Sequence, residues 1–199
     1  MATTMAMETA GGPYPVRFDV EYPETLSRLL IFVKWLLVIP HVIVLYFLQI
    51  VSTVLLIIAF FAILITAKYP EGLFKFNLGV MRWGANVNAY AGLLRDEYPP
   101  FSLDAGQYPV TLDVDYPTDL NRWMVLIKWL LVIPHLIIVA ILLVVAWIAT
   151  IVAWFAILFT GSYPKGIFDF VVGVDRWNLR VSAYAGFMTD RYPPFSLDT

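Results

Sequence analysis

The chain has 199 residues, of which 60% are hydrophobic and only 14% are charged, and its mean hydropathy is +0.76. A soluble domain is usually about 45–50% apolar and about 25% charged, and a small globule cannot hide a larger apolar fraction. The formal net charge of −2 provides no basic surface, so no nucleic-acid partner is expected. With no cysteine and two histidines, disulfides and thiolate catalysis are excluded and a metal site has little material. The composition predicts a membrane protein without cofactors.

An internal repeat covers almost the whole sequence. A shift of 94 residues aligns residues 14–104 with residues 108–198 without a gap, and about 49 of the 91 aligned positions are identical. The longest shared runs are KWLLVIPH, which begins at Lys34 and Lys128, and YPPFSLD, which begins at Tyr98 and Tyr192. The predicted organisation is a disordered leader (1–13), a first membrane repeat (14–104), a linker (105–107) and a second membrane repeat (108–199).

Each repeat opens with a short stretch in which apolar and polar residues alternate, at 16–22 and 110–116. This period of two is typical of a half-buried strand. Because an isolated strand is unstable, we expect the two strands to pair with each other or with other chains.

A long apolar block follows in each repeat. Residues 29–65 contain one charge, Lys34, and residues 123–159 contain one charge, Lys128. A helix of this length would measure about 55 Å, whereas the hydrocarbon core of a bilayer is about 30 Å thick. Pro40 and Pro134 lie inside the blocks, where proline kinks or interrupts a helix. A single straight transmembrane span would therefore leave part of each block outside the hydrocarbon core.

Three arrangements of the block are compatible with these lengths. A Pro-bent transmembrane hairpin, turning near 48–53 and 142–147, keeps the matching polar segments of both repeats on one side of the membrane. A short interfacial helix followed by one span, at 41–66 and 135–160, puts them on opposite sides. A shallow hairpin that enters and leaves one leaflet keeps the same-side symmetry. The symmetry of the repeat favours the transmembrane hairpin.

A third segment, at 73–94 and 167–188, is expected to form an amphipathic interfacial helix with a stripe of polar or small residues. The stripe consists of Lys75, Gly79, Arg82 and Asn86 in the first repeat and Asp169, Gly173, Arg176 and Arg180 in the second. The closing Tyr-Pro-Pro-Phe-Ser-Leu predicts a rigid extended clamp. The predicted fold class is an all-α integral membrane protein built from two parallel tandem repeats, each with a short strand, a Pro-bent hairpin and an interfacial helix.

Two groups of side chains are candidate binding residues. Ionisable groups at membrane depth indicate function by default, although a lysine can also extend to the headgroups and a histidine can satisfy local backbone groups. Arginines beside tryptophans suit lipid phosphate, but they also anchor interfacial helices or pair with aspartates. Asp96 and Asp190 are expected to cap helices or form ion pairs. The candidate lipid or ligand contacts are Lys34, His41, Arg82, Trp83, Lys128, His135, Arg176, Trp177 and Arg180.

Several motifs, matched in order, resemble a known bacterial set. The run from Lys34 to His41, Gly79 with Arg82-Trp83, and Ala89-Tyr90 before the terminal clamp resemble an uncharacterised membrane family called domain of unknown function 4389. The second repeat is similar in the same order. The resemblance implies two tandem copies in a bacterial integral membrane protein, and it implies no activity.

The sequence contains none of the common catalytic motifs, so we expect no enzyme. The leading functional hypothesis is a non-enzymatic scaffold or accessory subunit of a larger membrane assembly. The alternative is a lipid-handling or membrane-shaping protein, and a small pore or transporter comes third. The expected partners are membrane lipid and either other membrane-protein subunits or further copies of the chain. The expected location is the bacterial cytoplasmic (inner) membrane, multi-pass, with cytoplasmic termini.

Overall fold

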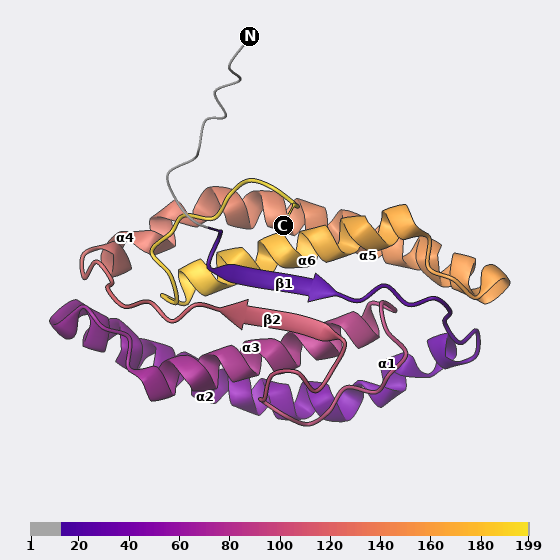
Figure 1. Cartoon of the computed structure of the whole chain (residues 1–199), viewed down its shortest axis with the longest axis horizontal. Helices are drawn as coiled ribbons and strands as arrows, with labels where there is room; N and C mark the ends of the chain where they lie inside the picture. Colours follow the sequence, from indigo (N-terminus) through magenta and orange to yellow (C-terminus); the bar gives the residue numbers. More distant parts are fainter. Residues whose placement is uncertain (1–12, 199) are drawn as a thin grey trace, which may run out of the picture.

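The computed structural model describes residues 13–198, so the leader expected at residues 1–13 lies outside the described residues apart from Pro13. Within this range the same order of elements occurs twice (Figure 1). The first copy contains β1 (Val16–Val20), a 3-10 turn η1 (Leu30–Phe32), α1 (Lys34–Leu37), α2 (Ile39–Thr66) and α3 (Glu71–Ala91). The second copy contains β2 (Val110–Val114), α4 (Met124–Leu131), α5 (Ile133–Thr160) and α6 (Lys165–Ala185).

The two predicted strands form and pair with each other. β1 and β2 are antiparallel, with Phe18 opposite Leu112 and Val16 opposite Val114. Phe18 and Leu112 are equivalent residues of the repeat, so this register relates the copies by an approximate two-fold axis through the strand pair. In both strands the apolar side chains are buried on one face and the polar side chains are exposed on the other, as the alternation predicted.

The apolar blocks do not form hairpins, and this prediction is wrong. α2 and α5 each continue for 28 residues without a reversal, and only a short helix precedes each of them. Residues 142–147 contain no glycine, proline or asparagine, so nothing interrupts the backbone hydrogen bonding at the expected turn. Pro40 and Pro134 lie in the first turn of the long helices, where the missing N–H would have no helical partner anyway. The arrangement of one short and one long helix matches the alternative prediction.

The third predicted helices form as α3 and α6. The residues that cap the C-terminal ends of α2 and α5, Ala67 and Gly161, are both in the left-handed conformation, with φ of 59° and 75°. The Tyr-Pro pair follows, and the chain then returns along the preceding helix, so that α3 packs against α2 and α6 packs against α5 (Figure 1). In each copy a strand is therefore followed by two long helices that pack against each other, α2 with α3 or α5 with α6.

The copies exchange their strands. β2, from the second copy, packs against α3 of the first, and β1 packs against α6 of the second. The segments after the strands follow the same exchange, because the Tyr22 hydroxyl donates to the Tyr163 carbonyl and the Tyr116 hydroxyl donates to the Tyr69 carbonyl. The two sequence repeats are consequently interlocked in one fold.

The helices α2, α3, α5 and α6 lie on the buried side of the strand pair. All the long helices and both strands run roughly along the long axis of the molecule (Figure 1). A groove of about 680 Å³ lies beneath the sheet, between Phe18 of β1, Leu45 of α2, Leu143 of α5 and neighbouring residues of α3 and α6. Residues 34–66 and 133–160 are long and apolar enough to cross a membrane, but only 11% and 17% of their most apolar stretches are buried.

Candidate functional site

A buried ion pair fixes the end of each copy. The Lys34 ammonium lies 2.8 Å from the Asp96 carboxylate and donates to the Arg95 carbonyl at 2.6 Å. In the second copy the Lys128 ammonium lies 2.7 Å from the Asp190 carboxylate. Both lysines are fully buried, and each ammonium sits 4.9 Å from the centre of a tyrosine ring, Tyr90 or Tyr184. The aspartates thus form ion pairs, which is one of the two roles that the sequence predicted for them, the other being helix caps.

The two histidines contact the same terminal clamps, and each also accepts a hydrogen bond from a tryptophan of α3 or α6. Trp83 Nε1 donates to His41 Nδ1 at 3.0 Å, and Trp177 Nε1 donates to His135 Nδ1 at the same distance. An indole nitrogen can only donate, so the histidine is neutral and carries its proton on Nε2. Each imidazole is stacked on a phenylalanine of the terminal clamp, with 3.9 Å between the His41 and Phe101 ring centres.

These contacts hold the extended clamp against the helices. The Tyr98 hydroxyl donates to the Leu37 carbonyl, so the start of the clamp is tied to α1. Further on, a methyl group added at Gly79 would lie 2.8 Å from Leu103 Cβ, and one at Gly173 would lie 2.9 Å from Leu197 Cβ. The lysine, histidine, tryptophan and glycine of each copy therefore act together to seat the clamp directly on α3 or α6.

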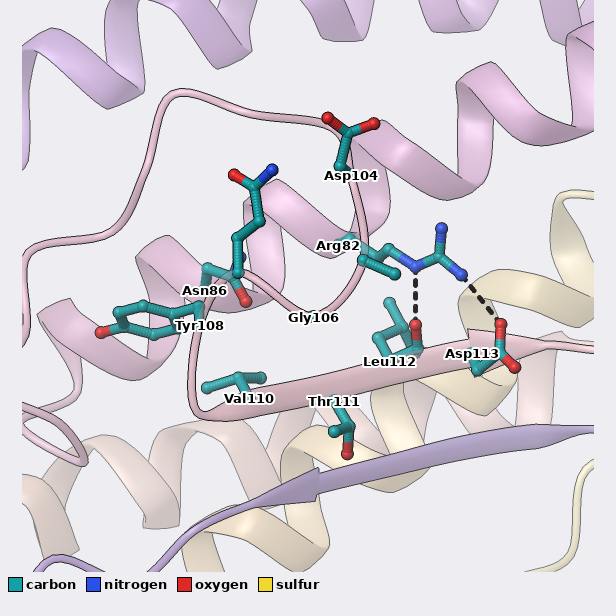
Figure 2. Close-up of a pocket in the computed structure, with 11 residues that line it drawn as sticks. Arg82, Asn86, Asp104, Gly106, Tyr108, Val110, Thr111, Leu112 and Asp113 are labelled. Atoms are coloured by element: carbon teal, nitrogen blue, oxygen red, sulfur yellow. Dashed lines mark hydrogen bonds and ion pairs between the residues drawn. The ribbon is translucent and has the colours of Figure 1, made fainter.

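Two of the candidate arginines bind the exchanged strands. Arg82 Nε donates to the Leu112 carbonyl of β2 and its guanidinium pairs with Asp113 at 2.8 Å (Figure 2). In the second copy Arg176 Nε donates to the Phe18 carbonyl of β1 at 2.9 Å. Strand edges present unpaired carbonyls that invite further strands. Each arginine therefore covers part of one edge of the two-stranded sheet. The helix that carries the arginine and the strand that it binds come from different sequence repeats.

The third candidate arginine has a different environment. Arg180 is 3% exposed, its Nε has no hydrogen-bond partner, and its guanidinium lies 5.4 Å from the centre of the Tyr14 ring. Burial and the nearby charge of Arg176 lower the pKa of Arg180 from its ordinary value. Asn86 occupies the equivalent position in the first copy.

The sequence reasoning missed a polar pair that joins the two copies. Asp175 of α6 accepts a hydrogen bond from Asn88 Nδ2 of α3 at 3.0 Å, beside the groove under the sheet. Burial raises the pKa of Asp175 to about 7, and the hydrogen bond from Asn88 offsets only part of that effect. The signal was a single acid directly after the apolar run Val171–Val174, where the first repeat has Met81.

The nine candidate residues therefore separate into two groups in each copy. Six of them meet at the two clamp seats, and these are Lys34, His41, Trp83, Lys128, His135 and Trp177. The three arginines of α3 and α6 instead face the strands and the clamp ends. The sequence did not indicate that the histidines would be stacked on Phe101 and Phe195.

The comparison with known proteins identifies the family and nothing further. Residues 28–102 and 122–196 each match the family described as Domain of unknown function (DUF4389). These stretches cover more than half of the chain, so the protein belongs to this family and carries two tandem copies of its domain, as the resemblance implied. Both matched stretches begin after the strands. No curated protein and no solved structure matches the chain.

Proposed function

We propose that this protein lies in one leaflet of a membrane, with α2 and α5 parallel to the bilayer surface, and that it shapes the membrane or handles its lipids. In this proposal the membrane is the bacterial cytoplasmic membrane. α2 and α5 lie within one leaflet, in place of the multi-pass arrangement expected from the sequence.

The first support is the exposed apolar surface of the long helices. Only one side of α2 packs within the protein, and the rest of its circumference is exposed and apolar apart from Gln49, Thr53 and the terminal Thr66. Monomeric soluble proteins rarely expose continuous apolar surface on this scale. The exposed large apolar residues of α2 are Ile39, Val42, Ile43, Val44, Tyr46, Phe47, Ile50, Val51, Val54, Ile57, Ile58, Phe61 and Ile65, and α5 exposes a similar set.

The observation that carries the orientation is the direction of the strands. Both strands run alongside α2 and α5, and their exposed face carries the ion pairs of Arg17 with Asp113 and Asp115 (Figure 1). If α2 and α5 crossed a bilayer, these exposed charges would lie at hydrocarbon depth, which is costly. With the bilayer against α2 and α5, the charged face points to water.

This orientation also suits the symmetry of the chain. The two-fold axis of an antiparallel strand pair is perpendicular to the sheet, and therefore here to the bilayer surface. Both copies then meet the same leaflet in the same way. Two helices of about 42 Å inserted into one leaflet would expand it relative to the other and favour curvature.

A topology experiment tests the orientation. The chain has no cysteine, so single cysteines can be placed at Thr25, before α1, and at Lys68, after α2, both of which are exposed. We expect an impermeant thiol reagent to label both positions from the same side of intact cells. Asp119 and Ser162 are the equivalent positions in the second copy. Labelling of Thr25 and Lys68 from opposite sides would show that α2 crosses the membrane and would overturn the proposal.

A second experiment tests the membrane activity. We expect the purified protein to deform vesicles into tubules, and the double variant Ile50→Gln, Ile57→Gln to lose this activity, because both side chains are exposed on α2. The control is Glu21→Gln with Glu24→Gln, two exposed residues just after β1, which should still deform vesicles. Intact vesicles with the unaltered protein would refute the shaping role.

The scaffold role is a second candidate, because another membrane subunit or a second copy would also cover the exposed surface of α2 and α5. In that case the chain should purify as an oligomer or with a partner in mild detergent. A monomer by light scattering would argue against this role.

A further inference from the structure

A pocket of about 520 Å³ lies where β1, α6 and both ends of the described chain meet. Its charged lining residues are Arg17, Arg176, Arg180, Asp19 and Asp198. Its volume falls within the range of about 300–1,000 Å³ that is usual for small-molecule sites. The pocket is on the side of the exposed strand face, away from α2 and α5, so it opens to water in the orientation proposed above.

Most of these charges already have partners. Arg17 pairs with Asp113 and Asp115 on the neighbouring strand. Arg176 pairs with Asp19 at 3.3 Å and donates to the Phe18 and Leu197 carbonyls. These side chains form the walls of the pocket and are held in place by the fold.

Arg180 is the exception among the charged residues that line the pocket. Its Nε is buried without a hydrogen-bond partner, and its guanidinium forms no other hydrogen bond or ion pair within residues 13–198. Asp198 is the acid whose charge acts on it, but this carboxylate accepts from Ser196 and is too distant for an ion pair with Arg180. A buried guanidinium normally has its donors satisfied, because burying an unpaired charge is costly. Its donors are therefore available to a ligand.

The first copy supplies the corresponding pocket without the arginine. There Arg82, Asp104, Tyr108 and Asp113 take the places of Arg176, Asp198, Tyr14 and Asp19, and the volume is only about 250 Å³ (Figure 2). Asn86 replaces Arg180. The scaffold therefore folds with asparagine at this position, and the buried guanidinium is not needed to build the pocket.

We propose that the pocket around Arg180 binds an anionic phosphate group, with the guanidinium as its charged donor. A planar guanidinium matches the oxygens of a phosphate and forms charge-assisted hydrogen bonds to them. The phosphate belongs either to a soluble compound or to a lipid headgroup, since both present the same chemistry. The pocket is assembled by the strand of one copy and the helix and clamp of the other, so ligand binding would tie the copies together.

The test uses the full chain in detergent and does not depend on the membrane orientation. Inorganic phosphate and glycerol phosphate are titrated against the unaltered protein, Arg180→Asn and Arg180→Lys, with chloride at matched ionic strength as control. We expect a saturable rise in Tm that Arg180→Asn weakens about tenfold or more and that Arg180→Lys partly retains. Circular dichroism checks that each variant is folded.

The converse variant and a vesicle arm complete the test. Asn86→Arg should add a second, weaker phosphate site to the first copy. If a lipid headgroup is the source, Arg180→Asn should reduce binding to vesicles with phosphatidic acid but not to vesicles of phosphatidylcholine alone, and free phosphate should compete. Equal responses of the unaltered protein and Arg180→Asn to phosphate and to both vesicles would overturn the proposal.

Discussion

The first and second copies place different side chains at equivalent points of one scaffold. Their clamp seats are the same, since Lys34 and Lys128 make matching ion pairs of 2.8 and 2.7 Å. Their strand-facing and groove-facing positions differ, because Arg180 replaces Asn86 and Asp175 replaces Met81. The shared contacts build the fold, while the differing residues supply polar groups that the fold does not need.

The largest effect should come from the clamp seats. Lys34→Met and Lys128→Met each leave an aspartate without its buried partner, and we expect each to lower the free energy of unfolding by about 3 kcal/mol. Unfolding in mixed micelles, followed by tryptophan fluorescence, measures this loss. The control Lys75→Met removes only an exposed pair with Glu71 and should leave the free energy of unfolding almost unchanged. Very different losses for Lys34→Met and Lys128→Met would break the equivalence of the two seats.

The glycines under the clamps should rank second. Gly173→Ala places a methyl group 2.9 Å from Leu197 Cβ and 3.1 Å from the Leu197 carbonyl oxygen, and Gly79→Ala does the same at Leu103. We expect each to cost about 1–3 kcal/mol, at the upper end because backbone must move. Gly84→Ala is the control, because nothing lies within 4 Å and alanine favours a helix, so stability should rise. If Gly173→Ala left the free energy of unfolding unchanged, the clamp would be packed only loosely against α6.

Asp175 should make the second copy sensitive to pH. Its folded-state pKa of about 7 lies above the value of about 3.9 in an unfolded chain, so the folded state keeps a proton that the unfolded state releases. The free energy of unfolding should therefore fall as pH rises from about 4 to 7, by about 2 kcal/mol between pH 5 and 7. Asp175→Met, which installs the residue of the first copy, should flatten this dependence. An unchanged pH profile in Asp175→Met would contradict the assignment.

The smallest effect should come from the exposed face of the strands. Arg17→Thr installs the residue of the second copy and removes the ion pairs with Asp113 and Asp115, all of which are about half exposed. We expect a loss below about 1 kcal/mol that shrinks further in high salt, because exposed pairs are screened. A loss comparable to that of Lys34→Met would show that the strand pair depends on this cluster.

Local patterns in the sequence predicted the elements well. The alternation at 16–22 and 110–116 became β1 and β2, and the stripe around Arg82 and Arg176 became α3 and α6. The predicted hairpin is wrong because the symmetry of the repeat does not outweigh the local preference of the backbone for a continuous helix. No residue in 142–147 breaks a helix, so α5 continues through the expected turn.

The contacts between the copies could not be predicted from one sequence. Nothing local in Val16–Val20 shows that it packs on α6, nearly 160 residues away at the Arg176 contact. For the same reason the sequence marked Arg82, Arg176 and Arg180 as equivalent candidates. Only the folded chain distinguishes Arg180. The Nε atoms of Arg82 and Arg176 donate to strand carbonyls of the opposite repeat, whereas Arg180 Nε has no hydrogen-bond partner.

The register of β1 and β2 is the one that a strand makes with a second copy of itself. An ancestor with a single copy could therefore have formed the same fold as a symmetric homodimer, each subunit lending its strand to the other. The linker at 105–107 turns those two subunits into one chain. In a homodimer every substitution occurs twice, whereas a fused duplicate can change one position alone. Arg180 and Asn86 illustrate this freedom, since one half keeps an asparagine where the other carries a buried arginine.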